Sequence, residues 1–301
     1  MVITSSARRF GFSLIETLVV VAIIGVLVGL TLAGVQKVRS RATAVQCQNN
    51  LRQIGLGAAN FHATHGHLPR GVTLQPEPGA FPWMGWGVLI LPYIEQDSVR
   101  QQSLEAIKAQ PSNFTASPPH PFTNVIAVYG CPADSRTRQL ALARGRLPVA
   151  LGSYLGVAGT RHSRKDGVLF ADSAVKFTDI TDGTSNTLLV GERPPSPDMW
   201  TGWWYGGVGV DWAGTADTVL GARERATPPG YPDMPDCGTG AAHFQQGKLD
   251  DKCAIMHFWS LHPGGAHFLF ADGSVRLLSY SVADILPALA TRAGGEAAVV
   301  P

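Results

Sequence analysis

The chain has 301 residues, of which 45% are hydrophobic and 15% are charged, and this composition excludes a disordered protein. Its 24 basic and 22 acidic residues give a formal net charge of +2, so no strongly basic surface favours nucleic acid as a partner. The 34 glycines and 21 prolines lie mostly after residue 65, which predicts turns and short strands in that part. Composition therefore favours an α+β protein.

The N-terminal segment contains a long apolar run, from Phe12 to Leu32, in which Glu16 is the only formally charged residue. A helix of about 20 such residues spans the roughly 30 Å core of a lipid bilayer. A carboxylate in that core costs roughly 2.5 to 3.5 kcal/mol, so we expect Glu16 to have a function. A secretory signal would have a shorter apolar stretch, and the residues after Arg8 and Arg9 fit a twin-arginine signal poorly. The run predicts a membrane-spanning helix.

The residues GFSLIE, from Gly11 to Glu16, resemble the N-terminus of a type IV prepilin or of a type II secretion pseudopilin. The resemblance implies that a prepilin peptidase cuts between Gly11 and Phe12, and that the new N-terminal Phe12 is N-methylated. In lipid, an ammonium group on Phe12 and a carboxylate on Glu16 are both costly. If Glu16 of an incoming subunit meets the Phe12 amine of a subunit in the filament, each charge gains a partner. Glu16 is therefore the predicted assembly residue.

The same resemblance implies three segments: a leader peptide at 1–11, a transmembrane and assembly helix at 12–62, and a globular, β-rich, pilin-like head at 63–301. The implied partners are the prepilin peptidase, other copies or related pilin-like subunits, the inner-membrane assembly machinery and the lipid bilayer. Counting basic residues on the two flanks of the apolar run would place the head in the cytoplasm. The cysteines and the prepilin motif outweigh that rule, so we expect one pass through the inner membrane and a head in the periplasm or outside the cell.

The helix should continue beyond the membrane, because the chain has no proline before Pro69. Apolar residues then recur at alternating spacings of three and four, which predicts one buried helix face. This stripe consists of Ala44, Cys47, Leu51, Ile54, Ala58 and Phe61. We expect the stripe to pack on a sheet, with Gly55 and Gly57 allowing strands to approach closely. A long helix on an antiparallel sheet is the pilin-like α+β fold.

The four cysteines, Cys47, Cys131, Cys237 and Cys253, have no metal-binding spacing. In an exported chain they suggest two disulfides, for which three connectivities exist. Because Cys47 lies on the apolar stripe, one of these would join the helix to Cys131 and leave Cys237 with Cys253. The sequence leaves the three pairings open.

Short apolar runs between turn residues predict the strands of the head. These runs lie at 87–94, 125–129, 153–158, 167–171, 187–191, 266–271 and 274–279. Asp272-Gly273, between the last two runs, favours a two-residue type I′ hairpin turn with positive φ at both residues. The proline-rich segments 71–82 and 111–123 are predicted loops.

A second resemblance covers most of residues 45–280. The stretches that carry it are CQNNLRQIGLGAANFHATHGHLPRG, WGVLILPYIEQ, YGCPAD, DITDGTSNTLLVGER and FWSLHPGGAHFLFADGSVRLLS. They are similar to those of a large bacterial family of pilin-like proteins whose head is a domain of unknown function. The family signature is a histidine, nine residues, then Asp-Gly, which here is His262 with Asp272 and Gly273. Because that family has no assigned activity, the resemblance is poor evidence for or against an enzymatic activity.

Oxygen-bearing side chains surround Gly183 and suggest a calcium site. Asp179, Asp182 and Asn186 could supply ligands there, and pseudopilin heads that resemble this one sometimes hold calcium in a loop. Calcium prefers six to eight oxygens, of which this stretch offers three or four. The alternative is an Asp-Gly turn that leads into the strand at 187–191. No other cofactor is expected.

Two groups of histidines could in principle bind zinc, which needs three or four ligands in tetrahedral geometry. The groups are His62, His65 and His67, and His257, His262 and His267. The alternative for the first group is a helix C-terminus, which histidine suits. His262, Asp272 and Ser260 could also suggest an anchored hydrolase, but no nucleophile elbow, second base or phosphate loop accompanies them.

An aromatic stretch contains Trp200, Trp203, Trp204, Tyr205 and Trp212. We interpret it as sheet core or a packed loop, and the alternative is a sugar-binding or subunit-contact surface. The predicted function is that of a non-enzymatic pilin- or pseudopilin-like subunit that assembles into a pilus, pseudopilus or surface filament. The alternative is a membrane-anchored exported protein that binds a carbohydrate or another ligand and does not polymerise.

Overall fold

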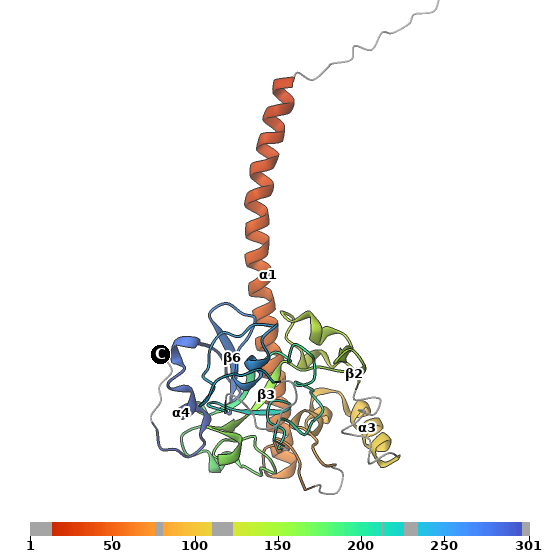
Figure 1. Ribbon diagram of the computed structural model, residues 1–301, viewed down its shortest axis with the longest axis vertical. Coiled ribbons are helices and arrows are strands. Elements are labelled where there is room, and N and C mark those ends of the chain that lie inside the picture. The colour runs from red at the N-terminus through yellow and green to blue at the C-terminus, as the bar shows by residue number, and fades with distance from the viewer. Residues whose placement is uncertain (1–13, 76–80, 110–122, 212, 226–233, 297–301) are drawn as a thin grey trace, which may run out of the picture. The chain divides into compact units, whose positions relative to one another are not determined.

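The computed structural model describes residues 14–75, 81–109, 123–211, 213–225 and 234–296. The predicted cleavage residues Gly11 and Phe12 lie outside these described residues, as do 76–80 and 111–122 of the two predicted loops. The chain divides into two compact units, Met1–Ala42 and Thr43–Pro301, each of which is considered by itself. Helix α1 (Leu14–His65) contributes residues to both units (Figure 1).

In the first unit, every described residue belongs to α1, and the described side chains are exposed. This part of α1 contains no proline, so its backbone hydrogen bonds continue without a break. The helix is long and apolar enough to cross a membrane. These features agree with the membrane-spanning helix that the apolar run predicts.

The second unit is built on a five-stranded sheet with the strand order β5-β3-β4-β6-β7. Its strands are β3 (Tyr154–Gly159), β4 (Leu188–Glu192), β5 (Val219–Gly221), β6 (Gly265–Phe270) and β7 (Val275–Ser279). Neighbouring strands pair antiparallel except for β3 and β5, which are parallel. A separate antiparallel ribbon consists of β1 (Ala141–Ala143) and β2 (Leu147–Val149). The fold is α+β and pilin-like, as predicted.

The helical elements of this unit, besides α1, are short. They are α2 (Trp86–Leu89), α3 (Asp97–Ala109), α4 (Leu286–Ala290), and the 3-10 helices η1 (Leu91–Ile94), η3 (Ala127–Tyr129), η4 (Ser135–Arg138), η5 (His162–Arg164), η6 (Phe177–Asp179), η7 (Lys252–Met256) and η8 (Tyr280–Val282). Most of the remaining described chain is turn and loop, which agrees with its glycine and proline content.

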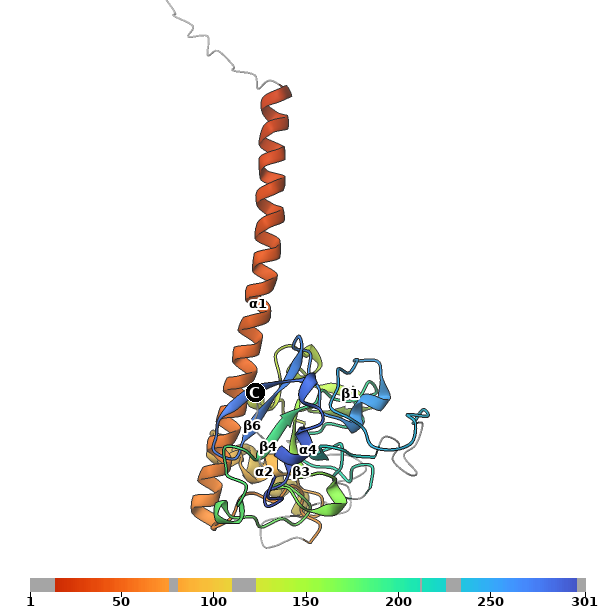
Figure 2. The same cartoon turned by 90° about the vertical axis from the view of Figure 1, so that its left-hand side faces the viewer.

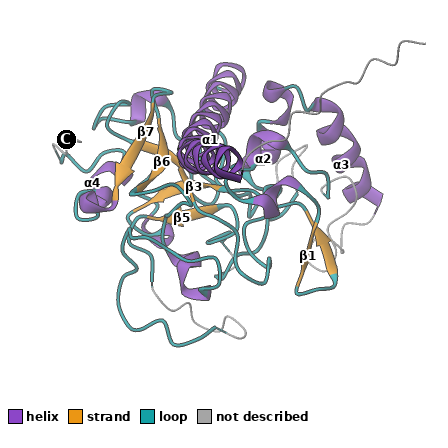
Figure 3. Ribbon diagram, turned by 90° about the horizontal axis from the view of Figure 1, so that it is seen from above, coloured by secondary structure: helices purple, strands orange, loops and turns teal. Residues whose placement is uncertain are grey.

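Figure 3 shows α1 and α4 beside the sheet. The sheet separates two apolar cores, one against the second half of α1 and one that includes α4. Because alternate residues of a strand point to opposite faces, Leu269 of β6 belongs to the first core, and Phe268 and Phe270 belong to the second. In β4 this alternation fails, and Leu189 and Val190 both join the first core. A register shift in the pairing of β4 with β6 accounts for the difference.

The second half of α1 runs beside the sheet (Figure 2), and its apolar stripe faces the first core, as its spacing predicts. Cys47, Leu51, Ile54, Ala58 and Phe61 are buried, and Ala44 is half-buried. The stripe thereby covers the face of the sheet that contains Leu269.

Two glycines bring α1 close to its neighbours. A Cβ atom on Gly55 would lie 2.9 Å from Leu269 Cδ1 of β6, so this glycine admits a strand, as expected. A Cβ atom on Gly57 would lie 2.9 Å from Ile94 Cγ2 of η1, so this glycine admits a helical segment instead. Both predicted close approaches are therefore confirmed. The partner of Gly55 is a strand, as predicted, whereas the partner of Gly57 is a 3-10 helix.

Four of the predicted strands are confirmed, because β3, β4, β6 and β7 lie at 153–158, 187–191, 266–271 and 274–279 within one residue. Three predictions are wrong: 87–94 forms α2 and η1, 125–129 contains η3, and 167–171 forms no strand. Short apolar runs suit a buried helix as well as a strand, and Pro92 stands in the first turn of η1, where proline favours helix initiation.

The hairpin between β6 and β7 differs from the predicted two-residue turn. Gly273 has a φ of +86°, whereas Asp272 does not have positive φ. The Phe270 N–H donates to the Ser274 carbonyl at 2.9 Å, and the Gly273 N–H donates to the Phe270 carbonyl at 3.0 Å. The connection therefore has three residues, with glycine in the left-handed position that such loops require.

All four cysteines form disulfides. Cys47 pairs with Cys131, and Cys237 pairs with Cys253. The first bond joins α1 to the loop after η3, across a sequence separation of 84 residues. It therefore ties the second half of the long helix covalently to the head.

Candidate functional site

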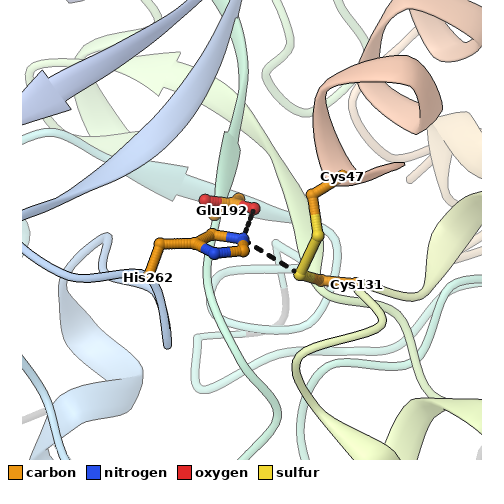
Figure 4. Close-up of side chains that lie close together, drawn as sticks. All are labelled: Cys47, Cys131, Glu192 and His262. Atoms are coloured by element: carbon orange, nitrogen blue, oxygen red, sulfur yellow. Dashed lines mark hydrogen bonds and ion pairs between the residues drawn. A yellow bond between two sulfur atoms is a disulfide. The ribbon is translucent and has the colours of Figure 1, made fainter. Parts of the chain in front are cut away.

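A buried polar cluster lies where α1, β4 and the loop before β6 meet. Figure 4 shows His262 between the Glu192 carboxylate and the Cys47–Cys131 disulfide. The Nε2 atom of His262 is 3.3 Å from Glu192 Oε1 and 3.3 Å from Cys131 Sγ. All four residues are at most 5% exposed. A single nitrogen atom thus contacts both a carboxylate and a disulfide inside the protein.

The local structure explains the position of each side chain. Cys47 lies on the buried face of α1, and Glu192 is the last residue of β4. The backbone of Cys131 is held by Ser153, whose Oγ accepts from the Cys131 N–H at 3.0 Å. The backbone of His262 is held by Ser260, whose Oγ accepts from the His262 N–H at 2.9 Å.

A second histidine orients the carboxylate. Glu192 Oε2 accepts from the backbone N–H of His267 at 2.7 Å and lies 3.0 Å from His267 Nδ1. The other ring nitrogen of His267, Nε2, lies 3.1 Å from Gln48 Nε2 on α1. With its proton on Nδ1, His267 donates to Glu192 and accepts from Gln48, so one tautomer satisfies both contacts. The rings of His262 and His267 meet edge to face at 4.8 Å.

Glu192 carries a negative charge in this buried position. Burial by itself would raise the pKa of Glu192, but hydrogen bonds from His262 and His267 and their charges hold it below its usual value. Nearby, burial and then the charge of Glu192 raise the pKa of Tyr154 well above its usual value. The cluster therefore contains one buried carboxylate whose charge is compensated by two histidines.

Two protein-family models match this chain. Residues 36–284 match the family described as "Protein of unknown function (DUF1559)". The chain belongs to this family. Residues 6–32 match the prokaryotic N-terminal methylation motif, so both resemblances in the sequence are confirmed, and neither description names an enzymatic activity. A search of curated proteins and a search of solved structures found no match to the chain.

The signature residues of this DUF1559 chain do not meet in space. His262 precedes β6 and is buried in the cluster, whereas Asp272 and Gly273 follow β6 in the exposed hairpin turn. Asp272 Oδ1 accepts from the Ser274 N–H at 2.8 Å, which gives this carboxylate a role in the turn. A catalytic pair of His262 and Asp272 is therefore excluded, and the partner of His262 is Glu192.

Sequence analysis did not single out Glu192. The available signal was an acidic residue directly after the apolar run TLLVG, in a stretch that belongs to the family resemblance. The sequence offers His267 as a candidate zinc ligand. In the structure, its two ring nitrogens instead contact Glu192 and Gln48. The partners could not be paired because 75 residues separate Glu192 from His267.

Asp179, Asp182 and Asn186 are engaged with the backbone. The Asp182 carboxylate accepts from the N–H groups of Gly294 at 2.6 Å and Gly295 at 2.8 Å. Asp179 Oδ2 accepts from the Lys176 N–H, and Asn186 Nδ2 donates to the Asp182 carbonyl. These contacts give the three side chains structural roles, and calcium binding there stays a prediction.

The histidines at the end of α1 also contact backbone atoms. His65 Nδ1 lies 3.1 Å from the Phe61 carbonyl, and His67 Nδ1 lies 2.7 Å from the Leu68 carbonyl. His62 Nε2 faces the Phe177 N–H at 3.5 Å. Among the described residues, these three histidines are not a group whose nitrogens could share a metal ion. The helix C-terminus is the interpretation that the structure supports.

The aromatic stretch is largely core. Trp203, Trp204 and Tyr205 are buried in the first core, and Trp200 is half-buried beneath the guanidinium of Arg144. Trp212 lies outside the described residues. The described part of this stretch therefore offers no broad aromatic surface to a sugar.

A mainly apolar groove of about 500 Å³ lies between the second half of α1 and the β6–β7 turn. Its lining includes Leu56 and Arg52 on α1, Phe177, and Asp272 and Gly273 in the turn. The Asp-Gly part of the family signature therefore shapes a surface groove, whereas the histidine part lies inside the protein.

Proposed function

We propose that this DUF1559 protein is a non-enzymatic pilin- or pseudopilin-like structural subunit. A prepilin peptidase cleaves it after Gly11, Phe12 is N-methylated, and the mature chain assembles through its N-terminal helix into a pilus, pseudopilus or surface filament. The observation that carries this proposal is the methylation motif at 6–32, which coincides with the apolar, exposed part of α1 that contains Glu16.

The physics of assembly follows from the cost of charge in lipid. A carboxylate in the bilayer core is costly, and so is the ammonium group of a mature N-terminus at Phe12. When Glu16 of one subunit meets the Phe12 amine of another, the two charges compensate each other. This pairing thereby sets the register between neighbouring helices. Subunits inserted in the membrane supply the growing filament.

The head has features that suit a subunit under load. The Cys47–Cys131 bond connects α1 to the rest of the head, and the Glu192–His267 pair connects β4 to β6. Both pairs are buried. A force on α1 would therefore reach the loop at Cys131 through a covalent bond. We place the head in the periplasm or outside the cell, where disulfides persist.

The first experiment is the intact mass and N-terminal sequence of the protein from its native membrane. A chain that starts at Phe12 and is heavier by one methyl group supports the proposal. A chain that starts at Met1 would overturn it in favour of a plain membrane anchor. A start beyond residue 30 would also overturn it, in favour of an ordinary signal peptide.

The second experiment separates assembly from anchoring. Crosslinks between the helices of different subunits are expected in the wild type and in the neutral control Val19→Ala, and should be lost in Glu16→Ala. The Glu16→Ala monomer should still insert in the membrane, since the change removes a charge from lipid. Equal crosslinking in Glu16→Ala would refute the assembly mechanism.

A further inference from the structure

We propose that the buried cluster becomes a zinc site when the Cys47–Cys131 disulfide is reduced. The ligands are the two cysteine sulfurs, His262 Nε2 and the Glu192 carboxylate. Among the described residues, these four are the one group of histidine, cysteine or acidic side chains whose ligand atoms could share a metal ion, all lying within 4.8 Å of one another.

The spacing of the donor atoms fits a tetrahedral zinc ion. With zinc–sulfur bonds of about 2.3 Å and zinc–nitrogen or zinc–oxygen bonds of about 2.1 Å, the ligand atoms lie roughly 3.4 to 3.8 Å apart. His262 Nε2 is 3.3 Å from Cys131 Sγ and 3.3 Å from Glu192 Oε1. Two of the six distances between donor atoms therefore already lie close to those of a tetrahedral zinc site, and all six are within 4.8 Å. The two sulfurs separate once the disulfide opens.

The neighbouring residues already orient these ligands as a metal site requires. His267 holds Glu192 Oε2 through two contacts, which leaves Oε1 facing His262. Ser153 and Ser260 hold the backbones of Cys131 and His262. Such outer contacts fix the ligand orientation in known zinc sites.

The cluster also has adjoining space. A cavity of about 10 Å³ is lined by Cys131, Glu192 and Ser260, among others. This volume is about that needed by one water molecule. The cavity therefore adjoins two of the four proposed ligands, Cys131 and Glu192.

The disulfide gates the site. A dithiol reductant transfers two electrons and two protons to the Cys47–Cys131 bond, which leaves one thiol on each cysteine and the reductant as a disulfide. Zinc then displaces both thiol protons, and His262 binds through its unprotonated Nε2. Two thiolates, an imidazole and a carboxylate form a donor set that suits zinc.

The test uses the full chain in detergent. A phosphine reduces both disulfides to thiols and is itself oxidised to the phosphine oxide, with the oxygen atom coming from water. After removal of the phosphine, zinc is added and the bound metal is counted. We expect one zinc per reduced chain and none per oxidised chain. Cobalt in place of zinc should give a thiolate-to-cobalt charge-transfer band and the visible absorption of a tetrahedral ion.

Matched variants locate the site. Two control variants should still bind one zinc ion. They are Cys237→Ser/Cys253→Ser, which removes the other cysteine pair, and His257→Ala, which removes a buried histidine beside the Phe258 carbonyl. Cys47→Ser/Cys131→Ser and His262→Ala should lose the zinc ion. His267→Ala should weaken zinc binding by roughly 10-fold to 100-fold, as loss of an orienting partner does elsewhere.

Every outcome decides the proposal. If reduction unfolds the chain, zinc should restore the near-ultraviolet circular dichroism, and failure to restore it would overturn the proposal. Absence of zinc in a reduced, folded wild type would do so too. Equal zinc in the wild type and in Cys47→Ser/Cys131→Ser, or a cobalt spectrum without a thiolate band, would assign the metal to another place.

Discussion

The Glu192 carboxylate on β4 accepts two hydrogen bonds from His267 on the neighbouring strand β6, one from its backbone N–H at 2.7 Å and one from its ring Nδ1 at 3.0 Å. Both side chains are 1% exposed. A carboxylate in this position compensates two buried donors that water does not reach. Glu192 therefore contributes to the stability of the pairing between β4 and β6.

Replacing Glu192 by leucine should destabilise the protein substantially. The backbone and ring donors of His267 would then lose their acceptor in a buried place, which costs about 1 to 3 kcal/mol for each unsatisfied group. Glu192→Gln keeps one acceptor oxygen and should cost less. Urea unfolding with intact disulfides measures the free energies. The control is Asp284→Asn, in an exposed pair with Arg223, which should change stability by less than about 0.5 kcal/mol; equal effects at the two sites would contradict the prediction.

Stability at alkaline pH should depend on His162. Burial would lower the pKa of His162, but the hydrogen bonds that its ring donates to Asp211 and Glu224, and the negative charges of these carboxylates, raise it to about 10. Because the folded-state value lies above the unfolded one, this contribution is complete below about pH 6.5 and is lost as the pH rises through about 10. The unfolding free energy of the wild type should fall between these values more than that of His162→Gln. Parallel curves for the two proteins would rule out this assignment.

The two disulfides should contribute unequally to stability. Their sequence separations are 84 residues for Cys47–Cys131 and 16 residues for Cys237–Cys253. From loop-closure entropy, we expect their removal to cost about 4.5 and about 3 kcal/mol respectively. Urea unfolding of the double alanine variants tests this order. A larger loss from the Cys237 pair would show that native-state packing, not chain entropy, sets the balance.

Two leucines five residues apart on α1, and therefore on different faces of the helix, should respond differently to truncation. Leu51 is fully buried in the first core, whereas Leu56 is 65% exposed. Leu51→Ala should cost about 2 to 5 kcal/mol because it leaves a cavity, and Leu56→Ala should change stability by less than about 0.5 kcal/mol. Thermal and urea unfolding provide the comparison. Similar losses would mean that the stripe does not face the core in solution.

Local patterns in the amino-acid sequence are enough to predict several features of this protein. Alternating spacings of three and four place Cys47, Leu51 and Ile54 on one face of α1, and period-two runs with strong turn residues mark β6 and β7. The GFSLIE motif likewise needs no tertiary contact to indicate pilin-type processing. These signals lie within a few residues of one another along the chain.

The tertiary structure decided what distant segments do together. Whether the apolar run at 87–94 forms a strand or a helix depends on what packs against it, and the structure makes it α2 and η1. Likewise, no local pattern joins Glu192 to His262, His267 and the Cys47–Cys131 bond, because these residues come together only when the sheet forms against α1. Periodicity reports which face of an element is buried, and long-range packing decides which side chain it is buried against.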